Sequence, residues 1–208
     1  MSNTRYNFML RRLATMLAVT TLTLSLVAAV TGVLIAFYYG PNAGGANDEI
    51  KYMVNQVPSG WLIYSLHNTA GNGLIAVCLG QIVVMFLGRQ FRRSWLTSWI
   101  AGIALTLTAI GLGWSAMSLG WTQLGYWRFK LELGTIESIP VIGSLLREIL
   151  TGGGAIGTVT IQHLYALHSY VLSIGAIVLA IIHLFGLLVQ EREQKQWCQR
   201  PRTSRISS

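Results

Sequence analysis

Charged residues are scarce in this chain of 208 residues, since Asp, Glu, Lys and Arg together make up only 11% of it. A soluble domain carries about 25% charged residues, so the composition argues against an ordinary water-soluble protein. Hydrophobic residues make up 52% and are gathered into long runs. Four runs reach the roughly 20 residues that cross a bilayer. We therefore predict four membrane-spanning helices, at residues 13–38, 61–88, 95–118 and 160–189.

Cysteine is nearly absent, with 2 residues. Cys78 falls inside the second predicted helix and Cys198 in the polar C-terminal segment, so the two are too far apart for a disulfide. The first apolar run is too long for a cleaved signal peptide, and we expect it to remain a membrane helix.

Acidic residues are few, and the resulting net charge of +8 raises the question of a nucleic-acid partner. The distribution of the basic residues answers it. Most of the 15 Lys and Arg residues lie before the first helix, between the second and third, or after the fourth, which four spans place on one side of the membrane. This pattern predicts that both termini face the cytoplasm, or the stroma of a plastid, and that no nucleic acid is bound. Contacts with anionic lipid or a partner are a second role for these residues. The basic residues of these three segments are Arg5, Arg11, Arg12, Arg89, Arg92, Arg93, Arg192, Lys195, Arg200, Arg202 and Arg205.

The fold class expected from these features is all-α, a four-helix transmembrane bundle. It forms one domain over residues 1–190, followed by a basic cytoplasmic tail at 191–208. The connection from Gly40 to Gly60 is rich in turn formers. In the connection from about 119 to 160, residues Ser144 to Leu150 predict a short amphipathic helix that lies flat on the outer surface.

Three histidines, His67, His168 and His183, lie well inside the predicted spans, and His163 stands at the outer end of the fourth. His168 and His183 are fifteen residues apart, which in a regular α-helix is four turns plus about 60° and an axial separation of about 22 Å. His67 and His168 each lie about 9–12 Å below the outer surface. Two facing imidazoles at one depth are typical axial ligands of a b-type haem. For a lone membrane histidine, an interhelical hydrogen bond is an equally good explanation, but the matched depth of this pair favours the haem.

The inner histidine lacks a matching partner. A partner for His183 is expected at position 81, and the residue there is Gln81, a poor ligand for haem iron. Gly32 falls at the depth of the outer pair, where a glycine allows close approach of a porphyrin. Close packing between helices is the alternative role for Gly32.

Several segments resemble cytochrome b6, in order and over about residues 15–190. They resemble, in turn, the stretch from helix A to helix B, the end of helix C, the outer loop and helix D of that family. The resemblance implies the N-terminal fold of cytochrome b, with each of two haems held between helices B and D. His67 and His168 would hold the outer haem. The segments are Thr31-Gly32, Phe37 to Pro41, Gly60 to His67, Ser118 to Trp127, Ile139 to Ser144 and Tyr165 to Leu172.

Departures from the family pattern gather at the haem positions. At the inner site, glutamine replaces the histidine and Ala18 replaces a glycine, which implies that the inner haem is lost or altered. Other departures affect the family's propionate-binding arginines and the cysteine that carries an extra haem. Tyr64, Asn68 and His163 stand at the arginine positions, and Met16 stands near the cysteine position.

The inner site has several possible states on this reasoning. Cys78 or Met85 could serve as a substitute ligand, because both point near the direction of His67 on the second helix. Alternatively, His183 alone could hold a five-coordinate haem. The site could also be empty, or filled by a lipid or a quinone.

We therefore expect a membrane electron-transfer protein that binds at least one b-type haem, coordinated by His67 and His168, and exchanges electrons with a quinone or a partner subunit. The alternative is a non-catalytic accessory or docking subunit of a photosynthetic or respiratory complex. A transporter is disfavoured, since no charged residue interrupts the spans. The expected partners are membrane lipid and other subunits of an electron-transfer complex, in a cyanobacterial thylakoid or plasma membrane.

Overall fold

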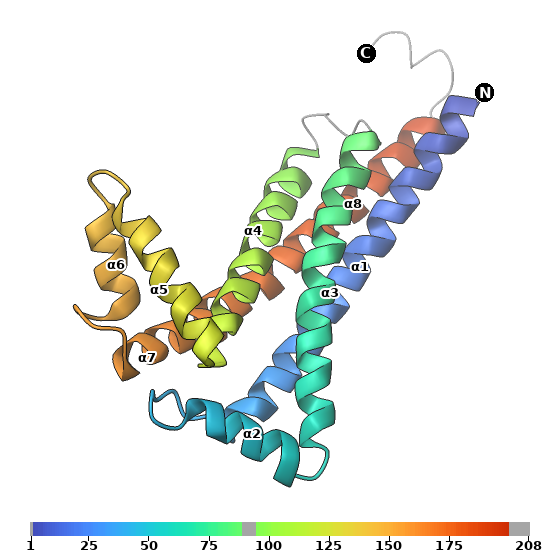
Figure 1. Cartoon of the computed structure of the whole chain (residues 1–208). Coiled ribbons are helices and arrows are strands. Elements are labelled where there is room, and N and C mark those ends of the chain that lie inside the picture. Colours follow the sequence, from blue (N-terminus) through green and yellow to red (C-terminus); the bar gives the residue numbers. More distant parts are fainter. Residues whose placement is uncertain (1, 89–94, 200–208) are drawn as a thin grey trace.

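Four long helices form the bundle that the apolar runs predict (Figure 1). The computed structural model describes residues 2–88 and 95–199, with side chains for residues 6–88 and 95–193. The regular secondary structure of the described residues is helical throughout, with no strand among them. Four candidate membrane spans are confirmed, at Tyr6–Ala36, Gly60–Leu87, Leu96–Leu119 and Thr158–Glu193. The protein is therefore an integral membrane protein of the all-α class.

The element order adds shorter helices to these spans. The helices are α1 (Ser2–Ala36), α2 (Ala46–Gln56), α3 (Gly60–Leu87), α4 (Leu96–Leu119), α5 (Gln123–Glu137), α6 (Gly143–Thr151), α7 (Thr158–Ala166), the π-helix η2 (Leu167–Leu172) and α8 (Ser173–Gln199).

The bundle places α3 and α8 at opposite corners. Helix α1 packs against both of them, and α4 also packs against both. The start of α1 and the end of α8 lie at one end of the bundle, while α2 covers the other (Figure 1). We call these the inner and outer ends, after the expected orientation. Residues that project from α3 and α8 toward the bundle axis therefore face each other.

The short helices differ in how far the sequence predicted them. Helix α6 confirms the expected helix at 144–150, and it ends at Gly152 with a φ of 68°. Helices α2 and α5 lie where only loops were expected, and that expectation was wrong. Thr122 starts α5 by accepting a hydrogen bond from the Gly125 amide at 3.0 Å.

The fourth span is longer and less regular than expected. Its last helix, α8, continues through Gln199, so the proposed domain boundary at residue 190 falls inside α8. Residues 200–208 of the predicted tail lie outside the described residues. The segment from Thr158 to Gln199 also contains η2, so the expectation of a regular α-helix between His168 and His183 was wrong.

Contacts at the outer end connect the loop after α1 and the start of α2 to the end of α4. The Tyr39 hydroxyl donates to the Leu119 carbonyl at 2.8 Å, and Asn47 Nδ2 donates to the Gly120 carbonyl at 2.8 Å. Burial raises the pKa of Tyr39 above its ordinary value, and the nearby Glu49 carboxylate and Tyr165 raise that pKa further. Tyr39 therefore keeps its proton and remains a donor at neutral pH.

Candidate haem site

The two histidines predicted at the outer level lie together in the bundle. His67 projects from α3 and His168 from η2, and their ring centroids are 6.4 Å apart with an interplanar angle of 53°. Both rings are partly buried. The structure thus brings these two predicted ligands to the same level on opposite corners of the bundle.

The π-helix sets the direction of His168. Fourteen residues separate His67 from Gln81 on α3, whereas fifteen separate His168 from His183. A π turn takes up one additional residue. Because η2 takes up that residue, His183 is rotated about the helix axis from His168 by the angle of fourteen α-helical residues, about −40°. Gln81 is rotated from His67 on α3 by the same angle. Both helices therefore direct their two key residues into the bundle.

Hydrogen bonds on Nδ1 fix the tautomer of His67. Its Nδ1 lies 2.9 Å from the Ala28 carbonyl and 3.2 Å from Thr31 Oγ1. The carbonyl can only accept, so Nδ1 carries the proton and donates. Thr31 uses its own proton toward the Val27 carbonyl at 2.7 Å. The lone pair of Nε2 is left available for coordination.

His168 is oriented in the same way by α4. Its Nδ1 lies 2.8 Å from Ser115 Oγ. The Ser115 hydroxyl donates to the Gly111 carbonyl at 2.8 Å, so its oxygen accepts the proton of His168 Nδ1. Within the described part of the chain, no hydrogen bond involves Nε2 of either histidine. Two imidazoles thus offer one free nitrogen each.

This spacing would suit an iron held between the two imidazoles. Metal–imidazole bonds of about 2 Å would place the two ring centres about 6 Å apart. The observed 6.4 Å agrees with this value. His67, His168 and their Nδ1 partners therefore suit a b-type haem.

Gly32 lies against the His67 ring. A Cβ added to Gly32 would lie 3.1 Å from His67 Cε1, a contact that the ring could relieve only by shifting. Gly32, the glycine expected beside a porphyrin, therefore lies at the outer level, and its lack of a side chain leaves space for the His67 ring.

The inner level is arranged differently. Gln81 Nε2 lies 3.0 Å from His183 Nε2, and His183 Nδ1 lies 2.8 Å from the Ser98 carbonyl. The Ser98 carbonyl can only accept, so Nδ1 donates to it and Nε2 accepts from the Gln81 amide. The nitrogen that would coordinate iron is therefore already used.

The inner pair is also enclosed. The exposed fraction is 3% for Gln81 and 1% for His183. Ala18 packs nearby with Ala14, Met85 and Leu187 in one buried cluster. A Cβ added to Gly102 of α4 would lie 2.9 Å from His183 Cε1. The residues present here do not fit a second haem.

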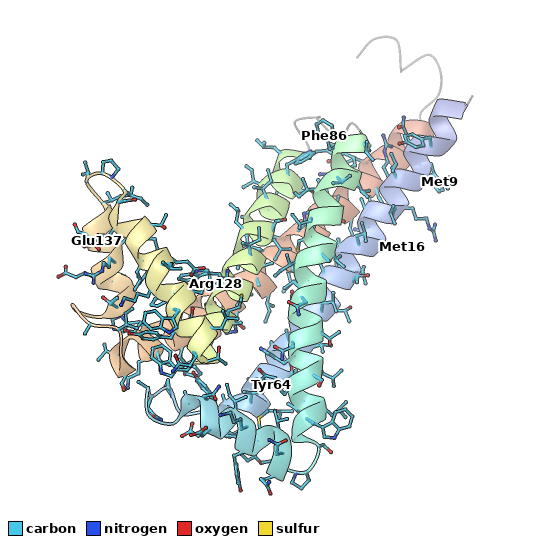
Figure 2. All side chains as sticks on the ribbon, in the orientation of Figure 1. Met9, Met16, Tyr64, Phe86, Arg128 and Glu137 are labelled. Atoms are coloured by element: carbon cyan, nitrogen blue, oxygen red, sulfur yellow. The ribbon has the colours of Figure 1, made fainter. Side chains whose placement is uncertain are left out.

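The remaining predicted residues lie around these two levels. Cys78 and Met85 both face the core, as expected, but they belong to two different buried clusters. His163 is exposed and its Nδ1 donates to the Ile149 carbonyl at 2.8 Å. Met16 is 57% exposed on α1, and Tyr64 is half-buried near the outer end of α3 (Figure 2).

Sequence reasoning missed the residues that orient the imidazoles. A Ser or Thr hydroxyl inside a helix normally donates to the carbonyl four residues earlier in the same helix, and Thr31 and Ser115 both make that bond. Ala28 and Ser98 act through backbone carbonyls, which carry no sequence signal. Gly102 was the one position with a readable signal, as a glycine near the inner level of the third span.

Comparison with known proteins was made at the levels of sequence and fold. The family described as cytochrome b/b6/petB matches residues 7–191. Cytochrome b6 of Auxenochlorella protothecoides is 34% identical over 170 residues, which is 82% of this chain and 79% of that protein. Cytochrome b6 of Mastigocladus laminosus is 32% identical over 170 residues, with the same shares of both chains.

A solved structure has the same fold. A chain of the "Hyperthermophilic respiratory Complex III" matches with a TM-score of 0.70 and 24% identity. The match covers 82% of this chain and 46% of that one, so this chain spans less than half of its length. This likeness confirms the four-helix bundle architecture.

Proposed function

This chain belongs to the cytochrome b/b6/petB family, and on that premise we propose that it carries electrons through one b-type haem coordinated by His67 and His168. The family implies b-type haem and membrane electron transfer. The observation that supports the site is the facing pair of imidazoles at a centroid distance of 6.4 Å, each with Nδ1 hydrogen-bonded and Nε2 free.

The residues around this site orient the side chains of the two ligand histidines. A bound b-type haem supplies reversible one-electron chemistry. The Ala28 carbonyl and Ser115 hydroxyl keep the Nδ1 protons in place and therefore keep both Nε2 lone pairs directed inward. About two turns further along α3 and α8 from the two histidines, Leu74 and Ala176 belong to a buried apolar cluster of the bundle.

The inner level gives the proposal its stoichiometry of one haem. Because Gln81 donates to His183 Nε2, the second coordination site of the family is replaced by a hydrogen bond. Electron exchange is then confined to the outer half of the bundle. The exchange partner is a quinone in the membrane or a partner subunit of an electron-transfer complex.

The location follows the same reasoning. The cytochrome b6 relatives support a thylakoid or plasma membrane of a phototroph. The basic residues at the inner end support an orientation with both termini in the cytoplasm or stroma, against anionic lipid.

A pyridine haemochrome assay on the purified full chain tests this proposal. We expect about one haem per chain and a low-spin ferric spectrum from two imidazole ligands. Two haems per chain contradict the proposed role of Gln81. A chain without haem contradicts the electron-transfer function and leaves the accessory subunit.

A further inference from the structure

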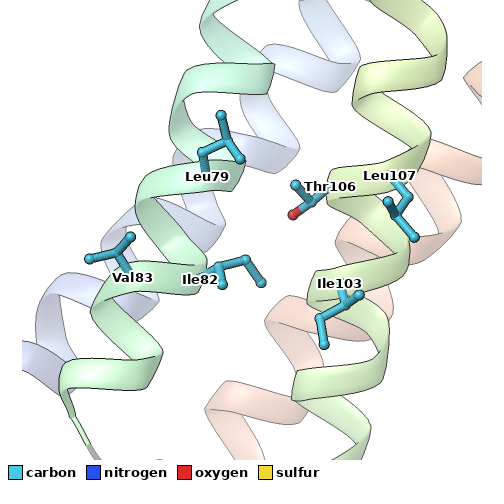
Figure 3. Close-up of a pocket in the computed structure, with 6 residues that line it drawn as sticks. All are labelled: Leu79, Ile82, Val83, Ile103, Thr106 and Leu107. Carbon is cyan, nitrogen blue, oxygen red and sulfur yellow. The ribbon is translucent and has the colours of Figure 1, made fainter.

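Two hollows of the described structure differ in their chemistry. The first is an apolar groove of about 340 Å³ between α3 and α4 (Figure 3). Its one hydroxyl belongs to Thr106 and already donates to the Gly102 carbonyl at 2.8 Å. The groove therefore suits any lipid chain and offers no group that would select one. The residues that line it are Leu79, Ile82, Val83, Ile103, Thr106 and Leu107.

The second hollow is a pocket of about 580 Å³ at the outer end of the bundle. It lies between the loop that leads into α2 and the start of α5. Its volume falls within the range of about 300–1,000 Å³ that is typical of small-molecule sites. Aromatic and polar side chains line it, together with Gly44 and Gly45. We call this hollow the outer pocket.

Three aromatic rings line the outer pocket. The ring centroids of Trp121 and Tyr126 are 5.9 Å apart with an interplanar angle of 83°, and those of Tyr126 and Trp127 are 5.4 Å apart with an angle of 85°. Trp and Tyr also serve as anchors at membrane interfaces, but that role needs no pocket. Edge-to-face contacts fix the rings relative to one another, so the pocket has a preformed aromatic surface.

Backbone contacts hold Trp121 in an unusual conformation. Its φ is 43°, in the left-handed region that residues other than glycine rarely adopt. The Trp121 amide donates to the Ser118 carbonyl at 3.1 Å, and Asn47 Nδ2 donates to the preceding Gly120 carbonyl at 2.8 Å. Such conformations persist where neighbouring contacts impose them, and they are frequent at ligand sites. The fold therefore fixes this ring at the outer pocket.

Hydrogen-bonding groups of both kinds remain available in the outer pocket. Within the described part of the chain, the side chains of Trp121, Gln123, Tyr126 and Trp127 make no hydrogen bond. The two indoles can only donate, whereas the Gln123 amide and the Tyr126 hydroxyl can both donate and accept. A ligand that satisfies these groups must itself carry several donors and acceptors.

The lysines of the chain occupy the features that would attract a charged ligand. Asp48 is the one charged residue among the described residues that line the outer pocket, and its Oδ1 pairs with Lys51 Nζ at 3.0 Å. Lys130 Nζ lies 5.0 Å from the centre of the Trp127 ring. An organic cation would have to compete with these two ammonium groups, and a phosphate would find no basic residue in the described lining. An uncharged ligand fits best.

A sugar ring meets all of these conditions. Its hydroxyls both donate and accept, and its C–H face can pack on an aromatic ring. The outer pocket lies at the end of the membrane spans, at the level of lipid headgroups. We propose that the outer pocket binds a hexopyranose ring, either as the headgroup of a membrane glycolipid or as a free sugar. Haem takes no part in this binding, so the proposal is independent of the proposed electron-transfer function.

Saturation-transfer NMR on the purified full chain tests the proposal. The probes are methyl β-galactopyranoside and methyl β-glucopyranoside, in a polyoxyethylene detergent that has no sugar headgroup. We expect saturation transfer to the ring protons of at least one glycoside. Trp127→Ala should raise its dissociation constant at least about tenfold, and Gln123→Ala about threefold.

Matched controls lie at the same end of the bundle. Trp61 is 60% exposed, as a counterpart to Trp127 at 54%, and Gln56 is an exposed amide at the end of α2. Neither residue lines the outer pocket. Trp61→Ala and Gln56→Ala should therefore leave the dissociation constant unchanged.

Nanodiscs separate the two sources of the sugar. They contain phosphatidylglycerol with or without monogalactosyldiacylglycerol. Loss of saturation transfer to the soluble glycoside when the glycolipid is present identifies a lipid headgroup as the ligand, and equal transfer in both identifies a free sugar. Three results overturn the proposal: no transfer to either glycoside, equal dissociation constants for the wild type and Trp127→Ala, or displacement of the glycoside by tetramethylammonium chloride.

Discussion

The outer and inner levels of the bundle use the same two helices for opposite purposes. At the outer level, His67 and His168 direct their Nδ1 atoms to Ala28 and Ser115 and leave both Nε2 atoms free. At the inner level, the Nε2 atom of His183 accepts from Gln81. The difference shows that a histidine at a ligand position can coordinate iron only if no facing side chain hydrogen-bonds to its Nε2 atom.

Burial reinforces the contrast. The outer imidazoles are partly exposed, whereas His183 is 1% exposed and Gln81 3%. Gln81 Oε1 is buried with no hydrogen-bond partner in the described part of the chain. Turning the amide to satisfy that oxygen would break the bond to His183, because the Ser98 carbonyl already fixes the imidazole tautomer. The inner level is thus held by its polar contacts, whereas at the outer level only the Nδ1 atoms are hydrogen-bonded among the described residues.

Loss of one outer ligand is the largest expected effect. We expect His168→Ala to reduce the haem content from about one per chain to about zero, because one axial ligand is removed. The pyridine haemochrome assay measures this change. His163→Ala is the control, since that exposed imidazole bonds only to the Ile149 carbonyl among the described residues. Full haem retention in His168→Ala contradicts the assignment of the outer level.

Converting the inner level into a copy of the outer one is the next largest effect. The double variant Gln81→His with Ala18→Gly supplies a second imidazole and restores the glycine that the family has at position 18. The haem content should rise from about one to about two per chain. Gln81→Leu is the control and should stay at about one. If the double variant also stays there, features other than Gln81 and Ala18 exclude the second haem.

Weakening the orientation of one outer imidazole tests the role of Nδ1. Ser115→Ala removes the acceptor of the His168 proton and should lower haem affinity about 10- to 100-fold. Titration of haem into haem-depleted protein measures the affinity. Thr108→Ala, which removes a hydroxyl from the same helix that bonds only to Ala104 among the described residues, should leave it unchanged. Equal effects of the two changes indicate general damage to α4.

Removing the inner imidazole should have the smallest effect on haem. His183→Ala is expected to leave the haem content unchanged and to lower stability by about 2 kcal/mol, because Gln81 and the Ser98 carbonyl lose their partner. Thermal unfolding followed by circular dichroism measures the stability. Leu184→Ala removes a neighbouring apolar side chain and separates lost packing from lost hydrogen bonds. Loss of haem from His183→Ala shows that the inner histidine is a ligand after all.

Much of the architecture was predictable because membrane spans depend on composition over long windows. The second and third helices were expected at 61–88 and 95–118 and lie at Gly60–Leu87 and Leu96–Leu119. Helices α2 and α5 were missed because each lies in a connection rich in glycine or polar residues. The signals that mark them are local: Asp48 and Glu49 in the first turn of α2, and Thr122 as the N-cap of α5.

The site was predictable to the level of its imidazoles. Depth along the spans paired His67 with His168, and the family resemblance placed Gln81 opposite His183. The hydrogen bonds that decide which nitrogen is free depend on backbone carbonyls and on rotamers of Thr31 and Ser115, and no residue count reveals these. That Gln81 donates directly to His183 could be read only from the packed structure.

The π-helix η2 changes how the number of residues in the fourth span relates to the direction of its side chains. Along a uniform α-helix, adding a residue rotates everything beyond it by about 100°. Within Leu167–Leu172 the wider turn takes up the added residue, and His168 and His183 keep their directions. Chain length and side-chain direction are therefore independent in this segment. A deletion of one residue between His168 and Leu172 would convert the wide turn to an ordinary one and leave the ligand geometry in place.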